Sequence, residues 1–208
     1  MLKPRIGRRA CCAALGLCAL PGAALAEVRQ AVVIQPLGAV GSAAVQAVQR
    51  LLGVHYNFEL RVAEPIPLPR GAYFPARKRY RAERILPVLA SAAPAAFRVL
   101  GLCSVDISTT KGSVADWGIL GLATIDGRAC VLSSYRCQRK ARDAEHARER
   151  FAKTAVHELG HTLGLEHCPS PGCLMRDGAG SVLTTDAEND LCQRCRAHLS
   201  GRGFLANR

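Results

Sequence analysis

Three histidines and one glutamate within eleven residues carry the strongest chemical signal in this chain. His157 and His161 are four positions apart, and Glu158 directly follows the first of them. In a helix, side chains four positions apart leave the same face about one turn from each other. Two neutral imidazoles at that separation can bind one zinc ion, and a neighbouring glutamate can hold a water molecule whose pKa the metal lowers to roughly 7. The pattern predicts a hydrolytic zinc site with Glu158 as general base and acid.

A glycine and a third histidine extend this pattern. Gly164 can take the left-handed backbone conformation that ends a helix and turns the chain back, which would bring His167 round as the third ligand. Three protein ligands leave the fourth zinc position to water, as hydrolytic zinc sites need. The alternative is that the three histidines are solvated or core side chains beside a helix-ending glycine.

An apolar stripe predicts the helix that must position these side chains. The stripe consists of Phe151, Ala155, Leu159 and Leu163. Because these residues recur every fourth position, we expect them to form one buried helix face, with the histidines pointing away from it. Residues 138–150 lead into the helix and are highly charged, and we expect His146 to belong to that solvated face.

Four cysteines follow the third histidine with metal-binding spacing. They are Cys168, Cys173, Cys192 and Cys195, arranged as C-x4-C and C-x2-C. Such a set is typical of a closed structural zinc site, which would fasten the loop that bears His167 to a last helix. In an exported chain the alternative is two disulfides. Three further cysteines, whose pairing the sequence leaves open, are Cys103, Cys130 and Cys137.

The combined motif resembles that of the archaemetzincins, a family of metzincin zinc metallopeptidases. The resemblance lies in the three histidines, the adjoining Cys168, the Cys-x-Met that ends at Met175, and the final Cys-x-x-Cys-x-x-x-Leu that ends at Leu199. It implies two zinc ions, one catalytic on the histidines and one structural on the cysteines. It also implies that Met175 packs beneath the catalytic metal without binding it. Where some families have a tyrosine ligand two residues after this methionine, the chain has Asp177, so we expect no tyrosine ligand.

The resemblance further implies how substrate is held. Gly121, Leu122 and Ala123 would form an edge strand that pairs with the backbone of a peptide. Cleavage of short peptides in the manner of an aminopeptidase is also implied. The residue that assists zinc as an electrophile stays open, and its candidates are Tyr73, Tyr80, Tyr135 and Arg136.

The remaining apolar runs predict a metzincin-like α/β fold. Residues 31–34 and 54–62 are expected strands on either side of a helix that begins at residues 41–42, which implies parallel pairing. A helix over residues 81–93 and a third strand over residues 97–107 follow. Residues 117–125 and 128–135 flank Asp-Gly, which predicts a hairpin with a type I′ turn. Thr185 and Glu188 have capping-box spacing for the last helix.

These elements predict a twisted, mostly parallel sheet with one antiparallel hairpin strand, an active-site helix and a small C-terminal subdomain. We expect residues 27–208 to form a single peptidase domain, with an upper part over residues 27–164 and a C-terminal part over residues 165–208. A domain of this length can bury a hydrophobic core of ordinary size.

Residues 1–26 have the composition of a secretory signal peptide. A basic head precedes an apolar stretch over residues 10–26, which ends in Ala-Leu-Ala. We therefore expect a periplasmic or secreted protein, with no stable membrane insertion after cleavage. Arg8-Arg9 leaves a twin-arginine route open beside the general one. An uncleaved anchor and an organelle transit peptide are the alternatives.

The net charge and the aromatic content limit the classes of binding partner that we expect. The formal net charge is +12, and four of the basic residues leave with the expected signal peptide. No basic run is interleaved with aromatic residues, which argues against binding to nucleic acid. We expect a peptide or protein as substrate. We also expect the protein to be a monomer. Two other functions compete with a peptidase: a non-catalytic zinc-binding or peptide-binding module with a structural zinc on the four cysteines, and a domain in which all metal is architectural.

Overall fold

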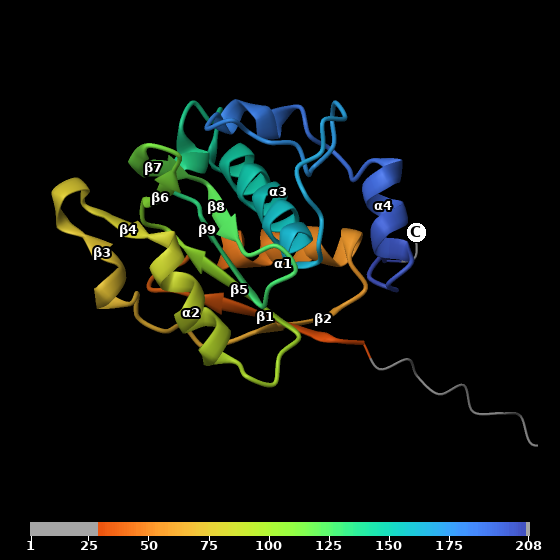
Figure 1. Cartoon of the computed structure of the whole chain (residues 1–208), viewed down its shortest axis with the longest axis horizontal. Helices are drawn as coiled ribbons and strands as arrows, with labels where there is room; N and C mark the ends of the chain where they lie inside the picture. Colours follow the sequence, from red (N-terminus) through yellow and green to blue (C-terminus); the bar gives the residue numbers. More distant parts are fainter. Residues whose placement is uncertain (1–28, 207–208) are drawn as a thin grey trace, which may run out of the picture.

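Five strands form a central sheet in the order β2-β1-β5-β9-β8 (Figure 1). In this computed structural model, which describes residues 29–206, four of the strands are parallel. They are β1 (Ala31–Pro36), β2 (Glu59–Val62), β5 (Arg98–Cys103) and β9 (Ala129–Ser133). Strand β8 (Gly121–Ala123) pairs antiparallel with β9 and forms an edge. The predicted α/β fold, with a mostly parallel sheet and one antiparallel hairpin strand, is confirmed.

Helices cover both faces of this sheet. Helices α1 (Ser42–His55) and α3 (Ala144–Thr162) lie on one face, and α2 (Ala82–Ala92) lies on the other (Figure 1). Leu100 joins the core under α1 and α3, whereas its neighbour Val99 joins the core under α2. Because side chains along a strand point to opposite faces in turn, a strand covered on both faces reads as a continuous apolar run. Among the described helices, none is long and apolar enough to cross a membrane.

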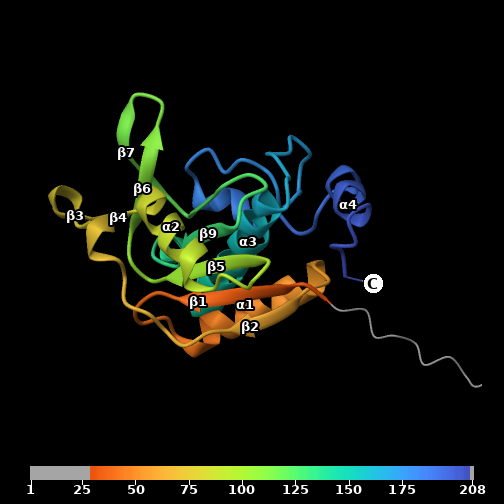
Figure 2. The ribbon, with the colours of Figure 1, turned by 60° about the horizontal axis from the view of Figure 1, so that its bottom comes forward.

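A second sheet of four strands was not predicted. Its order is β3-β4-β6-β7, and its strands are β3 (Tyr73–Phe74), β4 (Arg79–Arg81), β6 (Ile107–Lys111) and β7 (Val114–Ile119). The hairpin of β6 and β7 projects from the body at the end away from α4 (Gln193–Ser200), as Figure 2 shows. Arginine–aspartate pairs hold this sheet, among them Arg79 with Asp116 at 3.0 Å. Ion pairs leave no periodic pattern of apolar residues in the sequence, so the sheet that they hold was not predicted.

Short single-turn helices complete the described chain. They are η1 (Arg70–Ala72), η2 (Pro75–Arg77), η3 (Arg136–Gln138) and η4 (Val182–Asp186).

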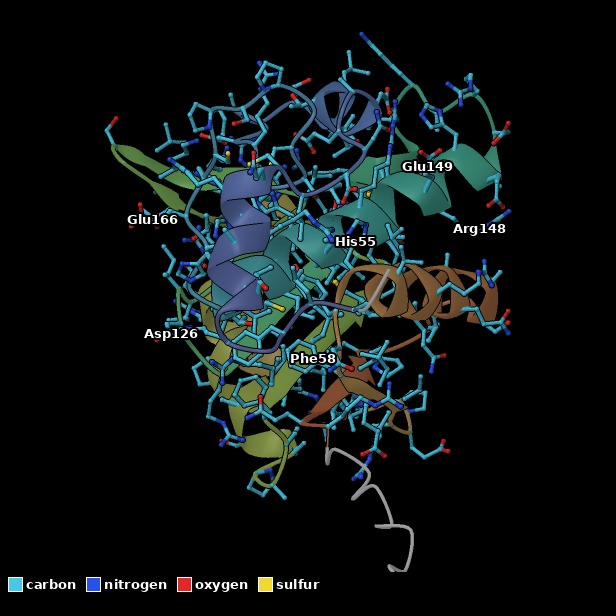
Figure 3. All side chains as sticks on the ribbon, turned by 90° about the vertical axis from the view of Figure 1, so that its right-hand side faces the viewer. His55, Phe58, Asp126, Arg148, Glu149 and Glu166 are labelled. Atoms are coloured by element: carbon cyan, nitrogen blue, oxygen red, sulfur yellow. The ribbon has the colours of Figure 1, made fainter. Side chains whose placement is uncertain are left out.

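An aromatic cluster holds the C-terminal segment against the sheet. Phe58, which lies below α4 in Figure 3, has its ring centre 5.4 Å from that of Phe204 and 5.7 Å from that of Phe97. The predicted signal peptide lies outside the described residues.

The predicted strand over residues 117–125 is two strands in two sheets. Its first part belongs to β7 and pairs with β6, and its second part is β8 and pairs with β9. The predicted third strand over residues 97–107 is likewise divided between β5 and β6. An apolar run cannot reveal such a division, because both halves are partly buried and only the tertiary partner differs.

The hairpin between β8 and β9 exists, but its predicted type I′ turn is wrong. That turn needs positive φ at both central residues, and only Asp126 has it, at +51°. The Gly127 N–H donates to the carbonyl oxygen of Thr124 at 2.9 Å, and the Asp126 N–H donates to that of His161 at 2.9 Å. The bond to His161 anchors the turn to the end of α3, which explains the different geometry.

Two predicted element boundaries are also wrong. Helix α1 continues to His55, where a strand was expected from residue 54, and β2 begins only at residue 59. The last helix begins after Cys192 rather than at Thr185, whose hydroxyl donates to the Val182 carbonyl within η4. The capping-box spacing of Thr185 and Glu188 therefore caps no helix.

The prediction that His146 belongs to a solvated face is wrong. His146 is buried, accepts the Arg142 N–H at Nδ1 and places Nε2 2.8 Å from Asp186 Oδ1. Asp186 also binds Arg150, with Nε to Oδ1 and Nη2 to Oδ2 both at 2.7 Å. Arg150 is only 1% exposed. This charged group fastens η4 to the first half of α3.

We expect Asp186→Asn to lower the free energy of unfolding by about 3 kcal/mol at pH 7, because the buried Arg150 would lose its counter-charge. The Arg150 guanidinium holds the pKa of Asp186 well below its usual value. The stabilisation is therefore complete above about pH 4 and is lost progressively as the pH falls below that value. Urea unfolding measures both effects: the difference from the wild type should narrow between pH 7 and pH 3.

The matched control is Glu145→Gln, which breaks the exposed pair of Glu145 with Arg148. An exposed ion pair contributes at most about 1 kcal/mol. Equal losses in the two variants, or a pH-independent loss in Asp186→Asn, would contradict the role given to Asp186.

Candidate functional site

The end of α3 turns the chain back over its own last residues. Gly164 has φ of +90°, a backbone conformation that a side chain strongly disfavours. The Gly164 N–H donates to His161 O and the Leu165 N–H donates to Gly160 O, both at 3.0 Å. These two bonds are the Schellman arrangement that ends helices. The predicted helix-ending role of Gly164 is confirmed, and the turn carries His167 toward the two histidines of α3.

The three histidines converge. One ring nitrogen from each of His157, His161 and His167 lies within 4.8 Å of the others. The Nδ1 of His157 lies 2.7 Å from the Leu174 carbonyl oxygen, and the Nδ1 of His161 lies 2.6 Å from that of Leu165. A carbonyl oxygen only accepts, so both Nδ1 atoms carry the proton and both Nε2 atoms present a lone pair.

Those two lone pairs face each other across 3.0 Å between the Nε2 atoms of His157 and His161. Two acceptors this close repel unless a cation lies between them, so the donor set fits a metal ion. Burial, followed by the nearness of His161, lowers the pKa of His157 to about 3, and burial also lowers that of His161. Both rings are therefore neutral at pH 7, which is the form that binds zinc.

His167 is the exposed member of the triad. About half of its side chain is open to solvent, and its Nδ1 lies 4.0 Å from Asp177 Oδ2. Asp177 occupies the position two residues after Met175, where the sequence had excluded a tyrosine ligand.

Glu158 lies beside the triad, against the edge strand. A Cβ atom at Gly121 of β8 would meet Glu158 Oε1 at 2.5 Å, so the carboxyl group lies directly on the Cα of that glycine. Burial raises the pKa of Glu158 to about 8. Only glycine at this position lets strand and carboxylate approach so closely.

A cleft of about 790 Å³ contains these groups. Its walls are the histidine face of α3, residues 117–123 of β7 and β8, and the segment after Met175. Glu166 lies on its rim, on the opposite side of Figure 3 from Arg148 and Glu149, which mark the first turns of α3.

The predicted substrate strand lies along this cleft. Leu120 O and Thr124 N bond to β9. Because backbone groups of an antiparallel strand alternate in direction, the N–H and C=O of Gly121 and Ala123 point to the free edge of β8. That edge is available to a further strand. The backbone N–H and C=O groups of Leu122 point the other way, toward β9.

Met175 lies beneath the triad. It is fully buried, and a Cβ atom at Gly160 would meet Met175 Sδ at 2.5 Å and Tyr56 Oη at 3.2 Å. Met175 therefore packs against the backbone of α3 between the two histidine turns.

The four predicted cysteine ligands also converge, with their sulfurs within 4.8 Å of one another. Cys168 and Cys192 are 3.6 Å apart at Sγ, and Cys173 and Cys195 are 3.8 Å apart. A disulfide needs about 2.05 Å, whereas four sulfurs at about 2.3 Å from one zinc stand roughly 3.8 Å apart. The donor set fits a tetrahedral metal better than two disulfides. Three further free thiols are buried, those of Cys103, Cys130 and Cys137.

The two clusters share one loop. The Cys168 N–H donates to Met175 O at 2.8 Å, and the Leu174 N–H donates to Asp190 O at 2.9 Å. Leu174, whose carbonyl orients His157, lies between Cys173 of one cluster and Met175 beneath the other. The position of the cysteines therefore controls the orientation of a histidine.

Of the four candidate electrophiles, only Arg136 lines the cleft. Its guanidinium binds Asp106 at 2.7 and 3.0 Å. Tyr73 and Tyr80 pack on each other in the second sheet, and Tyr135 is exposed outside the cleft. Lys153 and Glu188 are among the charged cleft residues that sequence reasoning missed. The sequence signal of Lys153 was a charge on the predicted active-site helix, and Glu188 was assigned to a helix cap.

Comparisons with known proteins agree with this geometry. Residues 69–201 match the sequence model of peptidase family M54, a range that includes both clusters. The archaemetzincin of Halobacterium salinarum is 32% identical over 170 residues, which cover 78% of this chain and 95% of the relative. That of Pyrococcus furiosus is 29% identical over 195 residues, covering 86% and 99%.

Two solved structures share the fold. The crystal structure of archaemetzincin from Methanopyrus kandleri superposes with a TM-score of 0.74 at 27% identity, covering 86% of this chain and 98% of that one. The archaemetzincin of Archaeoglobus fulgidus, solved in complex with malonate, has a TM-score of 0.70 at 33% identity and covers 81% and 99%. The similarity thus extends over nearly the whole of each solved chain.

We expect Gly160→Ala to destabilise the protein by about 1–3 kcal/mol, because the new methyl group overpacks the buried Met175. In an unhindered helix the same change stabilises by roughly 0.5–1 kcal/mol. Gly53→Ala in α1 is the control, since its nearest neighbour would be Leu60 at 3.9 Å. Thermal unfolding of both variants should give shifts of opposite sign; two shifts of the same sign would refute the close packing at Gly160.

Proposed function

Because this chain belongs to peptidase family M54, the archaemetzincins, and is a zinc metallopeptidase, we propose that it hydrolyses peptide bonds with Glu158 as general base and then general acid. The observation that carries this proposal is the convergence of three imidazoles next to a buried carboxyl group in one cleft. A module that only binds zinc or peptides needs no carboxylate at this point.

His157, His161 and His167 would hold the catalytic zinc. When bound, zinc supplies a Lewis acid that polarises the scissile carbonyl and acidifies the attacking water. The carbonyls of Leu165 and Leu174 keep the proton on Nδ1 of the two helical histidines. These bonds fix the ring orientation and increase the basicity of each Nε2.

Glu158 would move the proton. A zinc ion on the neighbouring histidines would favour the ionised form of Glu158 against the effect of burial. Its carboxylate accepts a proton from the attacking water and then donates that proton to the nitrogen of the leaving amine, so the group returns to its starting state. Its place against Gly121 sets it next to the edge strand. Burial limits competing solvent around the carboxylate.

The free edge of β8 would hold the substrate by strand addition. The outward N–H and C=O groups of Gly121 and Ala123 would bond to the peptide backbone, which gives affinity without selecting side chains. Cleavage at the amino end of short peptides is the mode that the family resemblance implies, and we include it in the proposal.

We expect Glu158→Gln to lower kcat by about 10²–10⁴-fold while bound zinc is unchanged, because the amide keeps the shape of the side chain but cannot accept the proton. Digestion of a peptide library measures turnover, and elemental analysis measures zinc. Glu166→Gln, a rim carboxylate of the same cleft, should keep activity near the wild-type value. Wild-type turnover that survives in Glu158→Gln would exclude this residue as the base.

A second, structural zinc on Cys168, Cys173, Cys192 and Cys195 is part of the proposal. It would fix the loop whose Leu174 carbonyl orients His157. The metal would thus act on catalysis indirectly, through the position of one backbone oxygen. Structural zinc contributes on the order of 10 kcal/mol to the folding of a small region, so its loss should loosen the loop.

We expect Cys192→Ser to reduce the zinc content from two ions per chain to one and to lower activity, because the loop beneath His157 becomes mobile. Elemental analysis measures the number of zinc ions per chain, and digestion of a peptide library measures the activity. Cys103→Ser, which changes a buried thiol outside both clusters, should keep both ions. Full activity with one zinc fewer would show that the second site does not support the first.

We also propose that the chain is exported and acts as a monomer. The signal peptide expected at residues 1–26 is the sole basis for export, and it lies outside the described residues. Four thiolates that reach an oxidising compartment unfolded would be at risk of disulfide formation. Export after folding, as the twin-arginine route allows, would avoid that risk.

A further inference from the structure

Glu188 is a buried carboxylate in the wall of the cleft without a partner for one of its oxygens. The residue is 4% exposed, and its Oε1 has no hydrogen-bond partner among the described residues. Leaving a buried oxygen unpaired costs roughly 1–3 kcal/mol, and more when the group is charged. A folded protein that keeps such a group in a cleft has a use for it there, or the group is paired only when something else is bound.

The nearest cation is already occupied. Lys153 lies one helical turn before His157 and lines the same cleft as Glu188. Its Nζ binds Glu149 Oε1 at 2.8 Å, Thr185 O at 3.2 Å and Asn189 Oδ1 at 3.4 Å. An ammonium group has three N–H donors, so these three acceptors use all of them. Lys153 therefore has no donor left for Glu188.

The other cation near Glu188 is Arg176 at the exposed rim. The positive charges of Lys153 and Arg176 favour the ionised form of Glu188, yet burial outweighs them and raises its pKa to about 7. No ion pair within 4.0 Å joins Glu188 to any described basic residue. The carboxyl group is thus held in an unfavourable environment that a further donor would improve.

The location of this group relative to the triad suggests what would supply the donor. Lys153 and Thr154 on α3 and Thr185 on η4 line the same cleft as Glu188. One helical turn is about 5.4 Å, so Lys153 lies close to the ligand His157 on α3, whereas Glu188 is not one of the three histidine ligands. A lysine or arginine side chain of a bound peptide carries the N–H donors that the unpaired Oε1 of Glu188 lacks.

We propose that Glu188 forms the base of a side-chain subsite beside the catalytic centre and that this subsite takes a lysine or arginine side chain of the substrate. This inference rests on the proposed peptidase function, because it assigns a specificity to the same cleft. The cationic group would donate to Oε1 and neutralise the carboxylate. The net positive charge of the chain does not oppose this, since the local acceptor is a carboxylate without a bonded cation.

The test uses sets of peptides that are identical except at one position, which carries lysine, arginine, norleucine or glutamate. Norleucine matches the length of lysine without its charge. For the wild type we expect kcat/KM to be about 10- to 100-fold higher for lysine and arginine than for norleucine, the range of a hydrogen bond to a charged group. In Glu188→Gln that preference should be largely lost, while the norleucine peptides are cleaved as before.

Glu166→Gln is the matched control, because it removes an exposed carboxylate from the rim of the same cleft. It should retain the preference for basic residues. Thermal unfolding separates specificity from structure: Glu188→Gln removes an unpaired buried charge and should not lower Tm. A lower Tm with equal loss of cleavage for every peptide would mean that Glu188 is structural, and the inference would fall.

Each peptide is supplied with a free and with an acetylated amino terminus. A preference that disappears on acetylation would assign Glu188 to the α-amino group and overturn the side-chain subsite. Binding of the same peptides to Glu158→Gln and to the double variant Glu158→Gln/Glu188→Gln is measured without turnover. If no peptide is cleaved by the wild type, the proposed function fails, and this binding comparison still decides the subsite; equal affinity for lysine and norleucine peptides would reject it.

Discussion

Two hydrogen bonds from histidine Nδ1 to backbone carbonyls are the constraint on which the site depends. They fix His157 and His161 in the tautomer that leaves both Nε2 lone pairs facing one point, 3.0 Å apart. Such an arrangement is unfavourable without a cation, so the rest of the chain must hold it in place. One carbonyl comes from Leu165, just after the turn at Gly164, and the other from Leu174 in the cysteine loop.

Those two supports have different physical origins. The first is local, because a left-handed glycine and two backbone bonds place Leu165 relative to His161 within a few residues. The second is long-range, since the cysteines that fix Leu174 come from both sides of a loop and from the start of α4. The metal proposed for these cysteines would fix such a loop, because metal binding contributes folding free energy to the region that holds its ligands.

Close approach of backbone to side chain gives the site its shape. Glu158 rests on Gly121, and Met175 rests on Gly160, each so closely that a methyl group on the glycine would have to displace the side chain. These contacts set the edge strand, the carboxylate and the floor of the cleft at fixed depths. Two charged residues of the cleft differ in their hydrogen bonding. All three N–H donors of Lys153 are bonded within the protein, whereas Glu188 Oε1 has no partner among the described residues.

The sequence by itself determined the parts that depend on local spacing. The helix that carries His157 and His161, the turn at Gly164, and the alternation of strands and helices in the main sheet all follow from periodicity and backbone preference over short stretches. Tertiary structure decided what spacing cannot encode. The run through residues 117–123 is shared between two sheets, and His146 is buried because Asp186 reaches it from a distant loop. Glu188 lines a cleft instead of capping a helix. Each of these depends on a partner far along the chain, and a pattern of neighbouring residues holds no information about such a partner.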